Sequence, residues 1–212
     1  MRQALNDCRL YGILDLGYVE DREVGNVVAA MIEGGVDLIQ LRGKKKSIEE
    51  LTVLAAELHK ITAQSSIPLI VNDYVAIAQG LPIEGVHVGQ DDDSITLVRK
   101  TAGRALIVGK STHSLDQAVA AQHEGADYIG FGPIFATPTK PDYDPIGLND
   151  IKRVHAEVTL PIFCIGGIKI DNLEQVIAAG AQRVVTVSGL LKAPDIANYA
   201  RACKKLLAFN SE

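Results

Sequence analysis

Side chains that could bind an anion follow one of the apolar runs of this sequence. Gln40, Arg42 and Lys44 alternate with other residues, so in an extended strand they share one face. Polar and basic groups on one buried face are costly unless an anion meets them. Arg42 can grip a phosphate through two hydrogen bonds, and Lys44 adds a mobile positive charge. The alternative for Lys44 is a solvated surface run over residues 44–46.

Carboxylates follow two later apolar runs. Asp73 comes directly after Asn72, and the acidic run 91–93 follows residues 85–88. One or two carboxylates, with room for water and substrate phosphates, are the usual ligands of protein-bound Mg²⁺. We therefore expect Asp73 and Asp92 to bind Mg²⁺. The alternative, helix capping before residues 94–100, explains Asp93 but not Asp73.

Hydroxyl and imidazole groups form a third set. Ser111 can donate a hydrogen bond to phosphate, whereas Ser114 suits the N-cap of a helix. His113 could serve as an acid or base near neutral pH, with a capping or packing role as the alternative. We interpret His87, which alternates with apolar residues, as a hydrogen-bonded packing residue.

Two glycine-containing segments near the C-terminus suit a phosphate. These are residues 165–168, which include Gly167, and residues 186–189, which include Val187 and Ser188. Glycine lets a phosphate approach the backbone N–H groups closely. Tight turns alone would explain either segment singly, but they explain the pair less well.

A long loop over residues 132–145 carries four prolines together with Thr137, Thr139 and Lys140. A loop longer than its connection requires is usually functional, often as a lid over a site. The alternative is a rigid crossing on the surface with its charged groups in water.

The elements that must position these residues repeat a strand–helix unit. We expect strands at Leu10–Asp15, Val36–Arg42, Leu69–Asn72, Gly85–Val88, Ala105–Gly109, Tyr128–Phe131, Pro161–Ile165 and Arg183–Val187. We expect helices at Val24–Glu33, Ile48–Ala63, Ser114–Glu124, Leu173–Ala179 and Pro194–Ala208, and a short one between the third and fourth strands. Ser47 and Glu50 form a capping box, and Gly34, Gly125 and Gly180 close helices at the C′ position.

Eight such units fit an α/β fold of one domain over residues 1–212, a (β/α)₈ TIM barrel. The rival is an open doubly wound sheet, but no GxGxxG motif follows the first strand. In a barrel, the active site lies at the carboxyl ends of the strands, which is where the residues above fall.

Composition limits the classes of partner. The chain has 212 residues, 47% apolar and 22% charged, with a net charge of −5, so no basic field attracts nucleic acid or anionic lipid. Cys8, Cys164 and Cys203 fit ordinary buried thiols in a reducing compartment. Without an apolar signal region or a run of about 20 apolar residues, we expect a cytoplasmic protein without membrane contact. A homo-oligomer is compatible with this sequence.

Taken together, the residues predict two anion sites and one metal site around one barrel mouth. One phosphate would lie on the last two loops, and a larger anion would meet Arg42, Lys44, Lys140 and a cation. No Ser-His-Asp set or CxxC array competes. This combination indicates neutralisation of a departing diphosphate.

At this point the chain resembles the thiamine phosphate synthase family over nearly its whole length. The motifs that carry the resemblance are Gln40-Leu41-Arg42-x-Lys44, Val71-Asn72-Asp73, the segment 85–92, the segment 111–114, the segment 132–140, Ile165-Gly166-Gly167-Ile168 and Val187-Ser188. Each is short, but their joint occurrence in family order is specific.

The resemblance implies a transferase that joins an aminopyrimidine diphosphate to a thiazole phosphate with the help of Mg²⁺. It implies that Gln40 contacts the pyrimidine and that Asp73 and Asp92 bind Mg²⁺. The pyrophosphate would be held by Arg42, Lys44, Asn72, Ser111 and Lys140, of which Arg42, Lys44, Ser111 and Lys140 are the expected catalytic residues. The thiazole phosphate would lie near Thr137, Thr139, Gly167, Val187 and Ser188.

Three alternatives stay open from the sequence. Ser188-Gly189 stands where the family usually has Ser-Ala, which resembles the related thiazole tautomerases, isomerases that use a histidine near the position of His113 and need no metal. The others are a catalytically silent paralogue that binds a phosphate ligand and an unrelated phosphate-binding barrel isomerase. The complete Thr-x-Thr-Lys segment and the paired aspartates favour the synthase.

Overall fold

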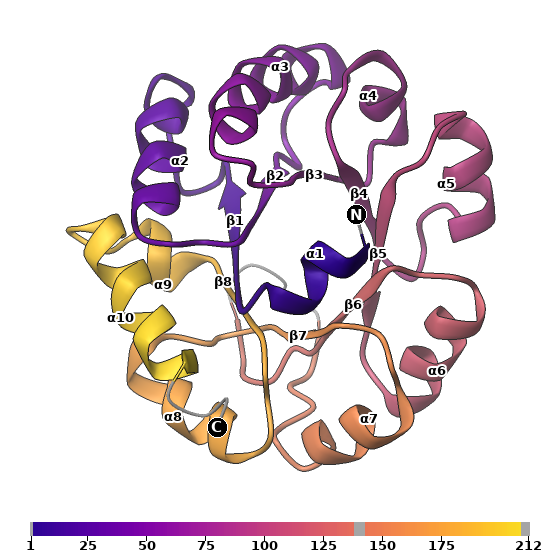
Figure 1. The fold of residues 1–212 in the computed structure, drawn as a ribbon, viewed down its shortest axis with the longest axis vertical. Coiled ribbons are helices and arrows are strands. Elements are labelled where there is room, and N and C mark those ends of the chain that lie inside the picture. The colour runs from indigo at the N-terminus through magenta and orange to yellow at the C-terminus, as the bar shows by residue number, and fades with distance from the viewer. Residues whose placement is uncertain (1, 138–142, 209–212) are drawn as a thin grey trace.

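The computed structural model describes residues 2–137 and 143–208, which form a closed barrel of parallel strands in chain order (Figure 1). The strands are β1 (Leu10–Asp15), β2 (Leu38–Arg42), β3 (Leu69–Asn72), β4 (Gly85–Val88), β5 (Ile107–Thr112), β6 (Tyr128–Phe131), β7 (Ile162–Cys164) and β8 (Val184–Thr186). β8 pairs with both β7 and β1, so the sheet has no free edge. The predicted (β/α)₈ fold is confirmed.

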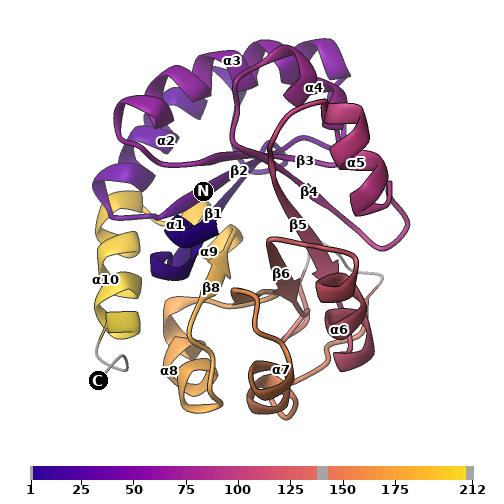
Figure 2. The ribbon, with the colours of Figure 1, turned by 45° about the vertical axis from the view of Figure 1, so that its right-hand side comes forward.

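Helices surround this barrel, apart from the first, which lies across one end of it (Figure 2). They are α1 (Arg2–Asp7), the 3₁₀ turn η1 (Asp21–Glu23), α2 (Val24–Glu33), α3 (Ile48–Gln64), α4 (Val75–Gly80), α5 (Ile95–Ala102), α6 (Leu115–His123), α7 (Ile151–Glu157), α8 (Ile170–Ala178), α9 (Ser188–Leu191) and α10 (Ile196–Ala208). The predicted capping box is present, because Ser47 accepts from the Glu50 amide and Glu50 accepts from the Ser47 amide. Ser114 caps α6 as predicted.

The alternation of side chains along the strands divides the core in two. One set, which includes Leu10, Leu14 and Leu41, packs outward against the helices. The other, which includes Tyr11, Tyr128 and Phe163, fills the barrel interior. Several inward positions near the carboxyl ends of the strands are polar, among them Gln40, Arg42 and Ser111. The same alternation that builds the core therefore also delivers side chains to the mouth.

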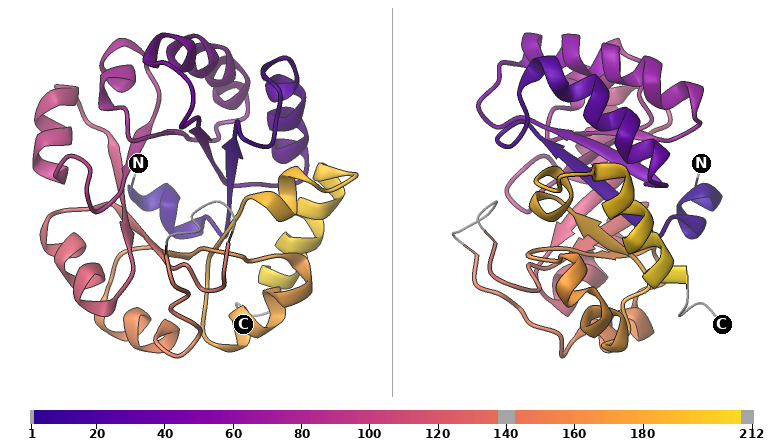
Figure 3. Two further views of the ribbon diagram at one scale, coloured as in Figure 1. Left: turned by 180° about the vertical axis from the view of Figure 1, so that it is seen from behind. Right: turned by 90° about the vertical axis from the view of Figure 1, so that its left-hand side faces the viewer.

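α1 lies across the end of the barrel where the strands begin (Figures 1 and 3). Its Leu5 is fully buried and belongs to the interior cluster with Tyr11 and Phe163. α1 therefore closes the base of the barrel, and the opposite end stays open. This helix, α7 and α9 were not predicted from the sequence.

Several predicted details were wrong. α2 ends with Gly34 in the right-handed region, and it is Gly35 that has the left-handed φ of 86°. Asp93 does not cap α5, because Ser94 accepts from the Leu97 amide. The fifth strand, expected at Ala105–Gly109, continues to Thr112, which carries Ser111 into the mouth.

The three cysteines are buried and free, as predicted. Among the helices that the structure describes, none combines the length and the apolar character needed to cross a bilayer.

Candidate active site

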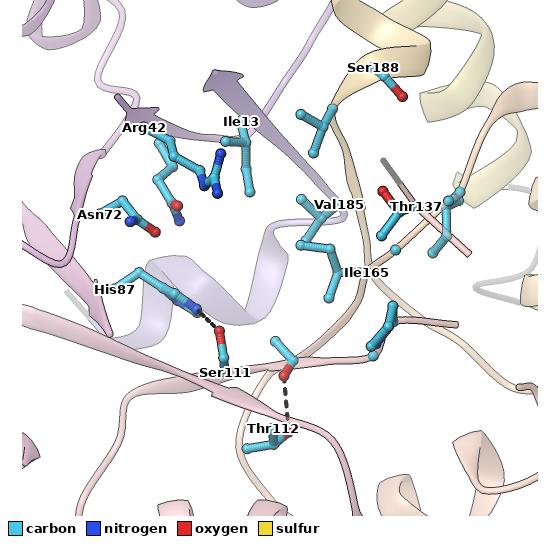
Figure 4. A pocket seen from close by; sticks show the side chains of 18 of the residues that line it. Ile13, Arg42, Asn72, His87, Ser111, Thr112, Thr137, Ile165, Val185 and Ser188 are labelled. Carbon is cyan, nitrogen blue, oxygen red and sulfur yellow. Dashed lines mark hydrogen bonds between the residues drawn. The ribbon is translucent and has the colours of Figure 1, made fainter. Parts of the chain in front are cut away.

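A pocket of about 780 Å³ of empty space, its mouth included, opens at the carboxyl ends of the strands. The predicted residues that line it are Gln40, Arg42, Asn72, Ser111, Thr137, Gly167, Val187 and Ser188. Figure 4 shows Arg42, Asn72 and His87 on one side and Thr137 and Ser188 on the other. The apolar side chains of Ile165 and Val185 lie between them. The pocket thus has a polar half and a loop-lined half, with apolar side chains along the part that joins them.

Arg42 stands at the end of β2 and donates through Nη1 to Oδ2 of Asp15, at the end of β1. The two residues are register partners in the sheet, so adjacent strand ends bring them together. Asp15 is fixed in turn, since its Oδ1 accepts from the Gly17 amide at 2.9 Å. The Arg42 guanidinium is therefore held at the mouth by a carboxylate that sequence analysis missed.

Lys44 lies beyond the end of β2 and does not line the pocket. Its Nζ donates to Oδ2 of Asp73 at 2.5 Å, and its side chain is 53% exposed. Asp73 has a left-handed φ of 63°, a conformation that few residues other than glycine adopt and that is common at functional sites. Lys44 and Asp73 thus form an ion pair at the rim of the polar half.

The Asp92 carboxylate lies near enough to Asp73 to influence its protonation. Asp92 also accepts from the Gly89 amide at 2.6 Å, which fixes its loop. Burial and the nearby Asp92 carboxylate raise the pKa of Asp73, and the Lys44 ammonium works against this rise. Two carboxylates held this close repel each other until a proton or a cation comes between them.

This pair fits Mg²⁺ by the chemistry of its oxygen donors, because Mg²⁺ keeps several waters and takes one or two carboxylates from the protein. Within residues 2–137 and 143–208, no group of three or more His, Cys, Asp or Glu side chains is arranged to hold a metal ion. A cation at Asp73 and Asp92 would therefore complete its shell with water and substrate oxygens.

His87, which we expected to be a hydrogen-bonded packing residue, is hydrogen-bonded through both ring nitrogens and only 8% exposed, but it also lines the pocket. Its Nε2 lies 2.9 Å from the Ser111 hydroxyl (Figure 4). Its Nδ1 lies 3.0 Å from the hydroxyl of the fully buried Tyr128. Ser111 is further fixed through its carbonyl, which accepts from Gln90 Nε2 at 2.5 Å.

His113 also lines the pocket. Its Nδ1 lies 2.5 Å from the Gly132 carbonyl, and its ring stacks on Tyr143 at a centroid distance of 4.5 Å. These contacts place His113 between two ends of the long loop, with one ring nitrogen engaged by the backbone.

The loop-lined half depends on Gly166 and Gly167, which have φ values of 100° and 64°. The segment after β6 packs directly on them, because the Phe135 amide donates to the Gly166 carbonyl at 3.0 Å. A Cβ at Gly166 would collide with Pro133. The Asn172 amide group of α8 donates to the Gly167 carbonyl at 2.9 Å and fixes the turn from behind.

Of the remaining predicted residues, Thr139 and Lys140 lie outside the described residues. Tyr11 and Tyr128, which contact Gln40 and His87 from the barrel interior, were also not predicted. A tyrosine inside an apolar run resembles a core residue, so the sequence offered no signal there. Asp15 offered one, since it is an acid at the carboxyl end of a strand, where barrels place their chemistry.

Comparison with known proteins identifies the relatives of this chain. A family model described as thiamine monophosphate synthase matches residues 10–190. A thiamine-phosphate synthase from Chloroflexus aurantiacus is 41% identical over 207 residues, covering 97% of this chain and 95% of the relative. One from Halalkalibacterium halodurans is 42% identical over 193 residues, covering 91% of this chain and 92% of the relative.

Solved structures agree. Thiamine phosphate pyrophosphorylase from Pyrococcus furiosus superposes with a TM-score of 0.88 at 29% identity, covering 100% of this chain and 99% of that one. (S)-3-O-geranylgeranylglyceryl phosphate synthase from Thermoplasma acidophilum superposes with a TM-score of 0.69 at 16% identity, covering 97% and 95% of the two chains. At that identity, the second likeness concerns the fold alone.

Proposed function

Because the chain belongs to the thiamine monophosphate synthase family, we propose that it joins a pyrimidine diphosphate to a thiazole phosphate, giving thiamine phosphate and pyrophosphate. The substrates are 4-amino-2-methyl-5-hydroxymethylpyrimidine diphosphate and 4-methyl-5-(2-phosphoethyl)thiazole or its carboxylated form. The observation that carries the proposal is the divided pocket, with hydrogen-bond donors in one half and a glycine-rich turn in the other.

The bond that breaks joins the methylene carbon of the pyrimidine to the diphosphate oxygen. Arg42, Asn72 and Ser111 line the polar half and donate hydrogen bonds to the oxygens as they gain charge. The electron-rich aminopyrimidine carries the positive charge left on the methylene carbon. The ring nitrogen of the thiazole then forms the new C–N bond, and because it carries no proton, no strong general base is needed.

Asp73 and Asp92 would hold Mg²⁺, which would supply positive charge to the departing pyrophosphate. The half-buried Asp73 would hold the cation, and the Lys44 ammonium lies 2.5 Å from the same carboxylate. When the diphosphate arrives, Lys44 can turn from Asp73 to the phosphate oxygens without leaving the rim. Gln40 at the pocket floor contacts the pyrimidine.

In the other half, Thr137, Gly167, Val187 and Ser188 surround the thiazole phosphate. The two glycines of the turn after β7 let phosphate approach the backbone closely. The sequence motif adds Thr139 to this set, and it adds Lys140 to the residues that hold the pyrophosphate. The apolar wall of Ile165 and Val185 excludes water from the space where the two substrates meet.

The test mixes the purified protein with both substrates and Mg²⁺ and measures pyrophosphate and thiamine phosphate. We expect both products in equal amounts, none when either substrate or Mg²⁺ is left out, and a loss of at least about 100-fold for Arg42→Ala. Arg153→Ala, on the exposed face of α7, is the matched control. Conversion of a thiazole tautomer without metal and without pyrophosphate release would instead identify a tautomerase.

We also propose the binding partners and the cellular location of the protein. Its partners are small molecules, with no nucleic acid or membrane among them, in line with the net charge of −5. The three free, buried thiols support a reducing compartment and hence the cytoplasm.

A further inference from the structure

Five side chains from five strands form one hydrogen-bonded chain across the pocket floor. Gln40 Nε2 lies 2.5 Å from the Tyr11 hydroxyl, which lies 2.9 Å from the Tyr128 hydroxyl. The Tyr128 hydroxyl lies 3.0 Å from His87 Nδ1, and His87 Nε2 lies 2.9 Å from Ser111 Oγ. The two ends, Gln40 and Ser111, both line the pocket, whereas the tyrosines lie in the barrel interior.

The interior of the barrel is shaped to hold the middle of this chain. Tyr11 and Tyr128 are 1% and 0% exposed, and their rings meet edge to face at 5.8 Å. Burial raises the pKa of both hydroxyls, so each keeps its proton. Gly109 provides the space, because a Cβ there would lie 2.5 Å from His87 Nδ1 and 2.1 Å from the Tyr128 ring.

Counting donors shows that the bonds can run along the chain in one direction. When Gln40 Nε2 donates to Tyr11, the Tyr11 hydroxyl donates to Tyr128, and Tyr128 donates to His87 Nδ1. A neutral imidazole that accepts at Nδ1 carries its proton on Nε2 and donates it to Ser111. The Ser111 hydroxyl then has its own proton left to donate into the pocket.

The reverse direction of hydrogen bonding exchanges the donor and acceptor roles at the two ends of the chain. With the Gln40 amide turned over, its Oε1 accepts from Tyr11, and every later bond reverses until Ser111 donates to His87 Nε2. Ser111 would then face the pocket only as an acceptor, which repels an anion. An anionic group at Ser111 therefore selects the first direction of hydrogen bonding. In that direction Gln40 contacts Tyr11 through Nε2, so its Oε1 remains available as an acceptor.

We propose that Tyr11, Tyr128 and His87 are positioning residues that couple the two pocket walls, so that a donor at Ser111 and an acceptor at Gln40 occur together. The pocket then selects a ligand with an anionic group at one end and an amino group at the other, and it discriminates against an oxo or hydroxy group in place of the amino group. This inference rests on the proposed function, whose first substrate is an aminopyrimidine diphosphate.

The test uses Tyr128→Phe, which removes the hydroxyl but keeps the ring packed against Tyr11 and Phe163. We expect the KM for the pyrimidine diphosphate to rise about tenfold, and the preference for it over its 4-hydroxy analogue to fall about tenfold. The KM for the thiazole phosphate should stay within about twofold. Tyr199→Phe, which removes a hydroxyl that accepts from the Ile170 amide outside this pocket, is the control for the loss of a hydroxyl.

A second measurement reads the direction of the chain without turnover. In protein saturated with Mg²⁺ and inorganic pyrophosphate, the ¹⁵N shifts of the His87 ring should report a proton on Nε2 and none on Nδ1. A Nδ1–H tautomer in the wild-type protein would overturn the proposal, and so would unchanged kinetics in a folded Tyr128→Phe. If Tyr128→Phe does not fold, Tyr11→Phe replaces it in the test, because it interrupts the same chain of hydrogen bonds. Absence of thiamine phosphate from the wild-type protein would defeat the proposed function alone, because the tautomer is read independently of turnover.

Discussion

The Arg42 guanidinium and the Asp15 carboxylate form an ion pair at two adjacent strand ends, with side chains 14% and 6% exposed. The pair has two effects on the pocket. It fixes the orientation of Arg42 before any ligand binds. It also neutralises part of the positive charge of the guanidinium, so the diphosphate meets only the remainder. Asp15 is therefore a structural partner of the anion site rather than a ligand-binding group.

Asp15→Asn should destabilise the protein by about 1–3 kcal/mol, because it leaves a mostly buried guanidinium without its counter-charge. Added pyrophosphate should raise the Tm of this variant more than that of the wild-type protein, since the anion replaces the missing charge. Urea denaturation and thermal melts measure both effects. Glu174→Gln, exposed on α8, is the control, and equal stability of all three proteins would contradict the structural role.

Asp92→Asn should weaken Mg²⁺ binding about tenfold or more, because it removes one of two facing carboxylates. Without Mg²⁺ the same variant should be no less stable than the wild-type protein, since the repulsion that helps raise the pKa of Asp73 is relieved. Calorimetric titration with Mg²⁺ and pyrophosphate checks the first expectation. Asp91→Asn, at the exposed neighbouring carboxylate, is the matched control, and equal losses in the two variants would argue against Asp92 as a ligand.

Gly166→Ala should cost about 2–4 kcal/mol of unfolding free energy. Its φ of 100° is unfavourable for alanine, and the new methyl group would meet the backbone of Pro133. Gly103→Ala is the control, because it has a left-handed φ of 64° but open space around the added Cβ. Chemical denaturation of both variants separates the collision from the backbone strain, and equal losses would show that the collision has no effect.

We expect the protein to lose stability in mild acid because of His155. Burial, and then the nearby Arg183 charge, lower the pKa of this imidazole from 6.5 to about 4. The unfolded chain therefore takes up a proton at higher pH than the folded protein does, so His155 stabilises above pH 6.5 and this contribution is lost as the pH falls toward about 4. After allowance for solvent screening, the loss is on the order of 1–2 kcal/mol.

The check compares unfolding free energies at pH 7 and pH 5 for the wild-type protein and for His155→Gln. The wild-type protein should lose more stability across this interval than the variant does. His123→Gln, at an exposed histidine of α6, should behave like the wild-type protein. If His155→Gln shows the same pH dependence as the wild-type protein, another group is responsible.

Much of the barrel could be predicted because short apolar runs end at clear turn residues. Both ends of β1, β3, β4 and β6 fall at the predicted residues. β5 does not, because Lys110, Ser111 and Thr112 continue the strand although their polar side chains suggest a loop. The polar residues that extend this strand are also those that serve the pocket, so the departure from the pattern marks the site.

The predicted pocket residues were found largely because barrels gather strand ends at one mouth. The sequence did not predict which side chains on other strands contact the pocket residues. Asp15 lies 27 positions from Arg42 and meets it because β1 and β2 are adjacent strands. Tyr11 lies 117 positions from Tyr128 and meets it because the closed sheet brings β1 and β6 together across the interior. Local patterns predict which face a side chain occupies, whereas these contacts depend on which strands become neighbours.

The helix that closes the base of the barrel determines where a fusion partner or a linker can be attached. Because α1 covers the end opposite the mouth, a fusion partner or an immobilisation linker joined ahead of α1 would project away from the entrance and leave both substrates free access. The buried Leu5 makes the first turns of the chain part of the interior core, so such an attachment needs a spacer before the helix rather than a replacement of it.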